Sequence, residues 1–503
     1  MTSPKRVLML GLDAAEADVI QQLIRNSKLP TLRHLMTSGV FHRMTSPADH
    51  YAGGVWPTFY TGQSVPWHGI FHNKLWRPEK MRAEVPTDTW IPTPPLWESP
   101  TYQHLPMCLV DIPMLVTPSR LDSVTYLGGW GTHDLIGQGS WPTNLWADLE
   151  GRYGPPEMPN EHFGKQTNRA LADLHTALLR TTDQLRDIST DLLRNQPWQF
   201  ACIVFGAIHR AGHYLWDKSQ VTDLISYRKD YHVVPDELID IYAKADAAIS
   251  SILTHVPDDT LVVIFALHGM GPNPGWSDLL PDILAKICKL VPGGSPRQGL
   301  LYTLKRKVPF AWVRPILRRM PSSLTQRLVP VWSQGMFDWD KTRWFPVPMD
   351  EAGYLRINLR GREAKGSVEP GVEYQTVCRE MESLVAGLRN AETGEAIVGE
   401  VVRAYEAADL KATYRALVPD LIFRWKGCSA TNTKRLISTE IPNFVYEVPK
   451  RLPSGRSGNH TSNAWLIACG EGAQSGTFDS VESISDLLPT VLKLLTNEPA
   501  SST

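Results

Sequence analysis

The chain has 503 residues, which is enough for two or three domains or for one large α/β domain with insertions. Apolar residues make up 42% of it and charged residues 20%, as is ordinary for a globular protein. The net charge of −1 creates no overall field that would attract nucleic acid or a membrane surface. No run approaches the ~20 apolar residues of a membrane-spanning helix. We therefore expect neither a nucleic-acid partner nor a membrane partner.

The cysteines and the N-terminal segment favour a cytoplasmic protein. The six cysteines lack CxxC spacing, and three of them, Cys108, Cys202 and Cys469, lie in apolar runs. Reduced thiols in the core of a cytoplasmic protein are therefore favoured over a disulfide framework. The first apolar run, Val7–Leu10, is too short for the hydrophobic region of a signal peptide.

Strand-like and helix-like segments alternate over the first 270 residues. Apolar runs predict buried strands, and apolar residues recurring every three or four positions predict amphipathic helices. The expected strands are Val7–Leu10, Met107–Ile112, Phe200–Phe205 and Leu261–Ala266, and the expected helices span 168–195 and about 235–253. This alternation predicts an α/β fold with a central, mostly parallel sheet covered by helices on both faces.

Residues 283–337 interrupt this alternation with ten lysines or arginines and no acidic residue. Two interpretations are open. One is a positive lid for an anionic substrate, and the other, which we prefer, is the solvated face of a helical insertion. We predict a discontinuous catalytic domain at 1–282 and 338–497, a basic helical insertion or lid at 283–337, and a disordered tail at 498–503.

The segment after the predicted strand Phe200–Phe205 is the most informative for function. It holds His209 and His213, which stand four positions apart. On a helix this spacing places both imidazoles on one face, where they can bind one cation. Asp13 follows the first predicted strand, at the edge where open α/β sheets bind ligands, although an aspartate there also caps helices.

Several different short motifs follow one another between residue 7 and residue 495. They are Gly11-Leu-Asp-Ala, Thr61-Gly62, His68-Gly-Ile, the strand before His209 and His213, His268-Gly-Met, Ile357-Asn-Leu-Arg-Gly-Arg362, Pro419-Asp-Leu, His460 and Ser485-Asp-Leu-Leu-Pro-Thr490. In this order they resemble the alkaline phosphatase superfamily, in particular its type I phosphodiesterase / nucleotide pyrophosphatase branch. The resemblance implies an alkaline-phosphatase-like sheet flanked by helices, with the site at the carboxyl ends of the strands.

Members of that family hold two zinc-type ions beside a nucleophilic Thr or Ser. The resemblance implies that this chain keeps some of the residues that bind those ions. One ion has an Asp and two His as ligands, and the other has two Asp, one His and the oxygen of the nucleophile. Asp13, His213, His268 and His460 match ligand positions. Asn73 falls where the phosphodiesterase branch has an asparagine that donates to the phosphoryl oxygen, although an asparagine there also suits a turn.

Three positions depart from the family pattern. His209 and Leu267 stand where the family has aspartate ligands. Ala52 stands nine residues before Thr61, where the nucleophile belongs, and an alanine can neither attack nor bind a metal. A shifted alignment would instead place Thr58 at the nucleophile position.

These departures predict one metal ion in place of two. The second site keeps only Asp13 and His268, too few ligands for a tight divalent site. The first site becomes three imidazoles, those of His209, His213 and His460, although each alone would more often be an ordinary polar residue. Such a set suits Zn²⁺ with an activated water or Fe²⁺ with a vacant face, so we expect one divalent ion, Zn²⁺ or Fe²⁺.

Three functions remain open from the sequence. The first is metal-dependent hydrolysis of a small anionic or phosphorylated substrate, a phosphoester or phosphodiester, in which a water or the substrate's own group replaces the missing nucleophile. The second is a metalloenzyme of the same fold that acts as a lyase, a transferase or an Fe-dependent oxidase of a small metabolite. The third is a non-catalytic binding protein. The resemblance favours the first, although a fold alone is a weak guide to function.

Overall fold

The computed structural model describes most of the chain. The described residues are 5–116, 121–132, 136–157, 166–217, 234–290, 296–297, 336–347, 352–426, 429–450, 452–474 and 476–496. Most of the basic stretch at 283–337 and all of the tail at 498–503 lie outside these ranges, so the predictions made for them stay predictions. Within the described ranges, no helix is both long and apolar enough to cross a bilayer, and the cysteines are free.

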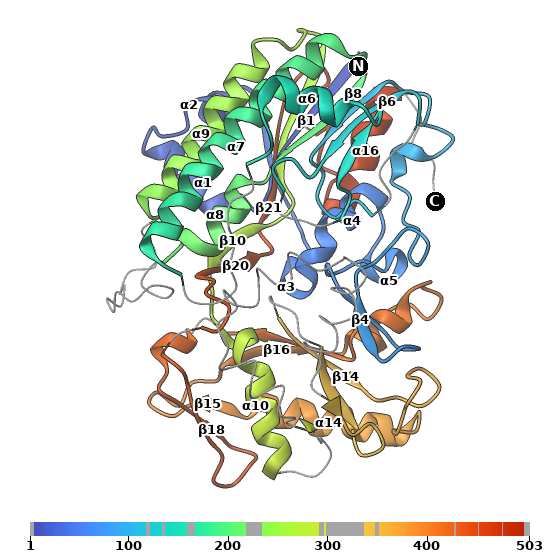
Figure 1. Cartoon of the computed structure of the whole chain (residues 1–503), viewed down its shortest axis with the longest axis vertical. Helices are drawn as coiled ribbons and strands as arrows, with labels where there is room; N and C mark the ends of the chain where they lie inside the picture. The colour runs from blue at the N-terminus through green and yellow to red at the C-terminus, as the bar shows by residue number, and fades with distance from the viewer. Residues whose placement is uncertain are drawn as a thin grey trace.

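An eight-stranded sheet forms the centre of the larger part of the molecule (Figure 1). Its strand order is β2-β21-β9-β1-β8-β5-β6-β7, and the five strands from β9 to β6 run parallel. The strands are β1 (Arg6–Leu12), β2 (Val40–Met44), β5 (Met107–Val110), β6 (Val124–Gly128), β7 (Gly139–Trp141), β8 (Phe200–Phe205), β9 (Thr260–Ala266) and β21 (Ala464–Gly470). The predicted mostly parallel sheet is confirmed, and all four predicted strands lie in it.

Helices cover both faces of this sheet because its strands are apolar on both sides. In β1, Leu8 and Leu10 pack toward one set of helices, whereas Val7 and Met9 pack toward another. The first set is α1 (Ala17–Arg25), α2 (Pro30–Ser38), α6 (Leu145–Tyr153), α7 (Asn168–Asn195), α8 (Ala207–Leu215) and α9 (Asp236–Leu253), and the second is α4 (Val55–Thr61) and α16 (Ile484–Thr496). Figure 1 shows α4 and α16 across the sheet from α7 and α9, which are the two predicted helices.

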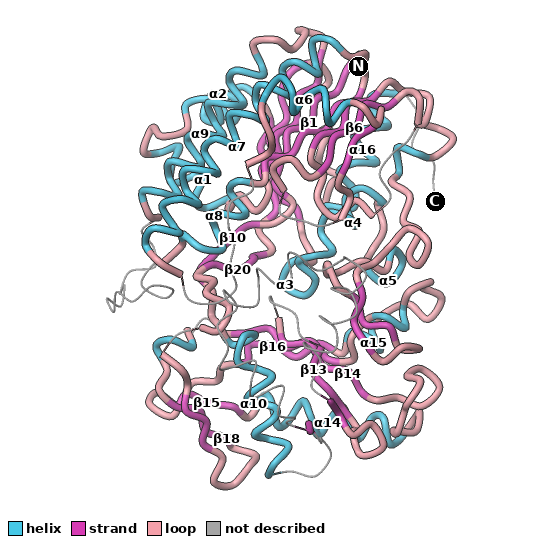
Figure 2. The backbone as a smooth tube through the Cα atoms, in the orientation of Figure 1, coloured by secondary structure: helices cyan, strands magenta, loops and turns pink. Residues whose placement is uncertain are grey.

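A smaller part of the molecule lies beyond the carboxyl edge of the central sheet (Figure 2). It holds a four-stranded antiparallel sheet, a three-stranded sheet and their own apolar cluster. The elements are α10 (Trp276–Leu290), β13 (Trp344–Val347), β14 (Gly353–Ile357), α14 (Val372–Ala386), β15 (Leu388–Asn390), β16 (Val398–Val402), α15 (Ala404–Ala407), η4 (Arg415–Leu417), β17 (Leu421–Trp425), η5 (Ala430–Asn432), β18 (Arg435–Ser438) and β19 (Val445–Glu447). The sequence did not predict that the smaller part has two sheets of its own.

The remaining described elements are short. They are α3 (Ala48–Tyr51), η1 (Ala52–Gly54), α5 (Val65–His68), β3 (Leu75–Arg77), β4 (Arg82–Glu84), η2 (Leu96–Glu98), β10 (Gly269–Pro272), β11 (Pro296–Arg297), β12 (Met336–Phe337) and β20 (Gly458–Thr461). Figure 1 shows β10 and β20 between the two parts, next to α8. Topology therefore brings the ends of β1, β8 and β9 and this antiparallel pair to one edge.

The motif residues near 357–362 and 419–420 form a buried ion network in the smaller part. Arg362 donates to both carboxylate oxygens of Asp420, at 2.9 and 2.7 Å. The hydroxyl of Tyr374 and the N–H of Ile357 also donate to Asp420, at 2.7 and 2.6 Å. Burial alone would raise the pKa of Asp420, but the Arg362 guanidinium holds it below its usual value. The network ties β14 to the start of β17 and so stabilises the smaller sheet.

Replacing Asp420 with Asn should destabilise the fold by about 3–5 kcal/mol, because the buried Arg362 would lose its counter-charge. The free energy of unfolding from denaturant titration measures this loss. The exposed Asp340 supplies the control, since Asp340→Asn should change that free energy by no more than about 0.5 kcal/mol. Equal stability of the two variants would contradict a stabilising network.

Asp111 ties the end of β5 to the loop after β6. It is buried in a left-handed backbone conformation with φ of 59°. Its carboxylate accepts the N–H of Trp130 at 2.7 Å and the N–H of Gly131. Burial raises the pKa of Asp111 from 3.8 to about 6, although these N–H groups favour the ionised form.

Because its folded-state pKa is raised, Asp111 contributes stability that is fully present below pH 3.8 and is lost as the pH rises through about 6. A difference of roughly two pH units corresponds to about 3 kcal/mol. The unfolding free energy of the wild type relative to Asp111→Asn should therefore fall by about this amount between about pH 4 and about pH 7.5. Denaturant titrations across that range test it, and parallel pH profiles for the two proteins would contradict it.

Candidate metal centre

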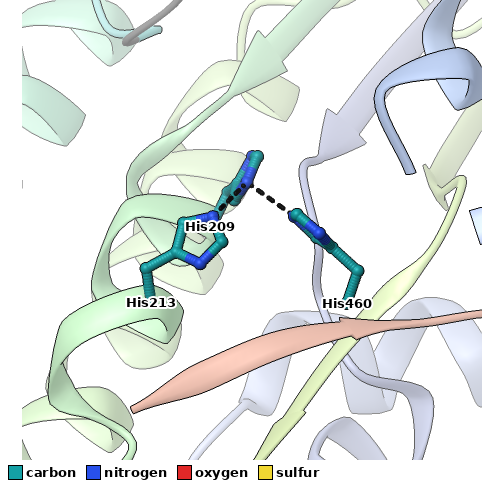
Figure 3. A group of neighbouring side chains, drawn as sticks. All are labelled: His209, His213 and His460. Atoms are coloured by element: carbon teal, nitrogen blue, oxygen red, sulfur yellow. Dashed lines mark hydrogen bonds between the residues drawn. The ribbon is translucent and has the colours of Figure 1, made fainter. Parts of the chain in front are cut away.

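Three imidazoles converge at the carboxyl edge of the central sheet, two from α8 and one from β20 (Figure 3). His209 Nε2 lies 3.0 Å from His213 Nε2 and 2.9 Å from His460 Nε2. In a tetrahedral zinc site with bonds of ~2.0–2.1 Å, ligand nitrogens stand roughly 3.3 Å apart. The three nitrogens are therefore close to the arrangement that one ion requires, although His460 is 251 positions from His209 in the sequence.

The hydrogen bonds of the Nδ1 atoms of His209 and His213 explain why the Nε2 atoms of these two rings can act as ligands. His209 Nδ1 lies 2.6 Å from Asp13 Oδ2, and His213 Nδ1 lies 3.3 Å from the carbonyl oxygen of Gly458. Both oxygens accept, so Nδ1 carries the proton of each neutral ring and Nε2 keeps its lone pair. Two lone pairs at 3.0 Å repel unless a proton or a metal cation lies between them. The donor set therefore fits a divalent ion held by nitrogen ligands.

Electrostatics keep the groups in the protonation states that ligation needs. Burial lowers the pKa of His460 well below its usual value, and the neighbouring His209 and His268 lower it further, so this ring is neutral. Burial would raise the pKa of Asp13, but His209 and His268 hold it well below its usual value, so this carboxyl is ionised. Neutral imidazoles are the form in which histidine binds metals.

A second group of candidate ligands, Asp13, His209 and His268, shares His209 with the first. Asp13 Oδ1 accepts the indole N–H of Trp56 at 2.9 Å and lies 3.3 Å from His268 Nε2. His268 Nδ1 lies 3.1 Å from the carbonyl oxygen of Gly269. His209 gives its Nδ1–H to Asp13 while its other nitrogen faces the first group, so among the described residues the second group gains no third ligand of its own.

The two other departures from the family pattern are buried apolar side chains. Leu267, between β9 and His268, is fully buried within a core cluster. Ala52 is the first residue of η1 and is 4% exposed. Neither side chain has an atom that binds a cation, so neither completes a second site.

Thr58, the alternative nucleophile, lies buried on α4 and is hydrogen-bonded to His68 at 3.0 Å. The backbone N–H of Ile70 donates to His68 Nδ1 at 3.1 Å, so the ring carries its proton on Nε2 and donates it to Thr58. Burial lowers the pKa of His68 to about 3, which keeps the ring neutral. A histidine in this tautomer cannot accept the proton of Thr58, so the geometry gives no support to Thr58 as a nucleophile.

Asn73, expected to donate to a phosphoryl oxygen, is exposed in the bend before β3. In the described part of the chain, no hydrogen bond joins it to the histidines. Its predicted role therefore rests on the resemblance alone.

Two residues near the histidines were not predicted from the sequence. Trp56 on α4 donates to Asp13, as described above. Glu16 accepts the hydroxyl of Thr461 at 2.6 Å and the side-chain amide of Asn463 at 2.7 Å, and thereby holds β20 beside the end of β1. Burial raises the pKa of Glu16. No spacing or motif in the sequence signals these contacts, because their partners are up to 447 positions apart.

One comparison with known proteins identifies the family of the chain, and a second identifies its fold. The family model described as type I phosphodiesterase / nucleotide pyrophosphatase matches residues 7–424. No similar sequence is found among curated proteins. Phosphonoacetate hydrolase from Sinorhizobium meliloti 1021, solved with phosphonoformate, is similar at a TM-score of 0.53 and 10% identity, covering 98% of this chain and 96% of that one. The alkaline phosphatase PafA is similar at a TM-score of 0.50 and 14% identity, covering 99% of this chain and 96% of that one. The chain therefore belongs to the type I phosphodiesterase / nucleotide pyrophosphatase family and has the alkaline phosphatase fold.

Proposed function

We propose that this chain is a metal-dependent phosphoester hydrolase with one divalent ion, Zn²⁺ or Fe²⁺, held by His209, His213 and His460. The convergence of their three Nε2 atoms at 2.9 and 3.0 Å carries the proposal. A divalent ion bound there would supply Lewis acidity, which polarises a phosphoryl oxygen and activates water at neutral pH. The family of the chain supports phosphoester chemistry.

The two candidate nucleophile positions, Ala52 and Thr58, favour hydrolysis without a covalent phospho-enzyme. Ala52 presents only a methyl group, and the hydroxyl of Thr58 accepts from His68. The attacking group is therefore a water molecule or a group of the substrate itself. Attack forms one P–O bond as the bond to the leaving oxygen breaks, and the leaving oxygen takes up a proton.

The substrate we propose is a small phosphorylated or otherwise anionic molecule. Phosphonoacetate hydrolase, which shares the fold, was solved with phosphonoformate, a small phosphorus-containing anion. Three neutral imidazoles leave the positive charge of a divalent ion uncompensated, which favours an anionic ligand. We further propose that the protein works in the cytoplasm, where its free cysteines stay reduced.

Chelator-treated wild-type protein should bind one Zn²⁺ per chain, and His213→Ala should lower the affinity at least ~100-fold, because two imidazoles cannot hold the ion tightly. Competition titration against a zinc-sensitive dye measures both values. His255→Ala, at an exposed position after α9, should bind as the wild type does. Two tightly bound ions, or none, would contradict the one-ion centre.

The metal-loaded enzyme should hydrolyse nucleotide or aryl phosphodiesters. The product should contain oxygen from the solvent, and the protein should not become phosphorylated. Single-turnover reactions in ¹⁸O water, with acid quenching and intact-protein mass spectrometry, test both points. Thr58→Val should turn over at the wild-type rate, since its hydroxyl takes no part. An acid-stable phospho-protein would contradict direct attack. Oxygen uptake by Fe²⁺-loaded protein, with no phosphoester turnover, would overturn the proposed reaction.

A further inference from the structure

We propose that Trp56 and Asp13 are positioning residues that set the tautomer of His209, and that Asp13 is not a metal ligand. The inference rests on the metal centre of the proposed function and assigns Asp13 a different role from the one its family position implies. Carboxylates that accept from a metal-binding histidine fix its ring orientation and raise its basicity.

Asp13 and His209 are joined by a short contact between their side chains. Their Oδ2 and Nδ1 atoms are 2.6 Å apart, and the side chains are 4% and 14% exposed. A short, water-poor bond to an ionised carboxylate is among the strongest hydrogen bonds that a side chain makes. It places the proton on Nδ1, so the Nε2 lone pair faces His213 and His460.

A contact with Trp56 orients Asp13 itself. Trp56 Nε1 donates to Oδ1 at 2.9 Å, and indole nitrogen is a donor only. The indole cannot turn away, because it is 3% exposed and packs edge-on against Phe59 and Phe265. Gly11 leaves it room, since a Cβ there would lie 3.1 Å from the Trp56 ring. Oδ1 therefore faces Trp56 and, at 3.3 Å, His268 Nε2, whereas Oδ2 faces His209.

This arrangement predicts what an amide would do at position 13. In Asp13→Asn, the N–H of Trp56 must face the amide oxygen, so the NH₂ group must face His209 Nδ1. His209 would then carry its proton on Nε2, where it points at the other two histidines and blocks the ion. The same reversal of an imidazole follows when an amide replaces the carboxylate behind a catalytic histidine in other enzymes.

The central experiment compares Asp13→Asn, Trp56→Phe and the double variant. Asp13→Asn should still bind at most one Co²⁺ per chain, about 10–100-fold more weakly than the wild type and with a changed visible absorption spectrum. Trp56→Phe should lower the Co²⁺ affinity less than tenfold. The double variant should bind more tightly than Asp13→Asn alone, because without the indole N–H the amide can turn its oxygen toward His209.

The matched control is Asp246→Asn. Asp246 on α9 is also a buried carboxylate, and it accepts the N–H groups of Thr31 and Leu32 at 3.0 and 2.8 Å. Its replacement should lower the melting temperature and leave the Co²⁺ affinity and spectrum unchanged. This control separates a positioning role from general loss of stability.

A metal-free readout separates this inference from the proposed function. In chelated protein labelled with ¹⁵N-histidine, NMR should show His209 protonated on Nδ1 in the wild type and on Nε2 in Asp13→Asn. Wild-type affinity and spectrum in Asp13→Asn, or a second ion that is lost with Asp13, would overturn the inference. A double variant no tighter than Asp13→Asn would overturn the role of Trp56. Absence of phosphoester turnover with these results intact would overturn only the proposed reaction.

Discussion

The buried carboxylate of Asp13, at the end of the central strand β1, is the group on which the candidate centre depends. It accepts from His209 on α8 and from Trp56 on α4, which lie on opposite faces of the sheet. An ionised group in such a place is costly unless every oxygen has a donor, so the two helices and the strand must keep their relative positions. The direction in which the His209 imidazole points follows from that constraint.

The sequence predicted the parts of this centre that depend on local spacing or on one strand. The four-residue spacing of His209 and His213 required only a helix after β8, and α8 supplies it. The position of Asp13 required only that β1 end at the edge of a parallel sheet. Nothing in the local sequence connects β20 with α8, so only the family resemblance could assign His460 to this centre.

The sequence could not predict what the side chains do to one another. Asp13 was expected to bind a metal, and its bond to His209 depends on a distance that no spacing encodes. Thr58 matched a nucleophile in type, but its partner His68 comes from the next short helix and has the wrong tautomer for a base. The motif residues Arg362 and Asp420 likewise form a buried ion network in the smaller part, a contact that the motif alone did not predict.

The pairing of β20 with β10 has a consequence for how the protein is made. His460 reaches α8 on this two-stranded ribbon, which Glu16 fastens to the end of β1. During synthesis, α8 leaves the ribosome long before residue 458 exists. The nascent chain then offers only two of the three imidazoles of the trio, and two imidazoles bind divalent ions weakly. Under the proposed function, metal loading would therefore follow the synthesis of β20, and a chain that stops short of β20 would lack the third imidazole of the candidate centre.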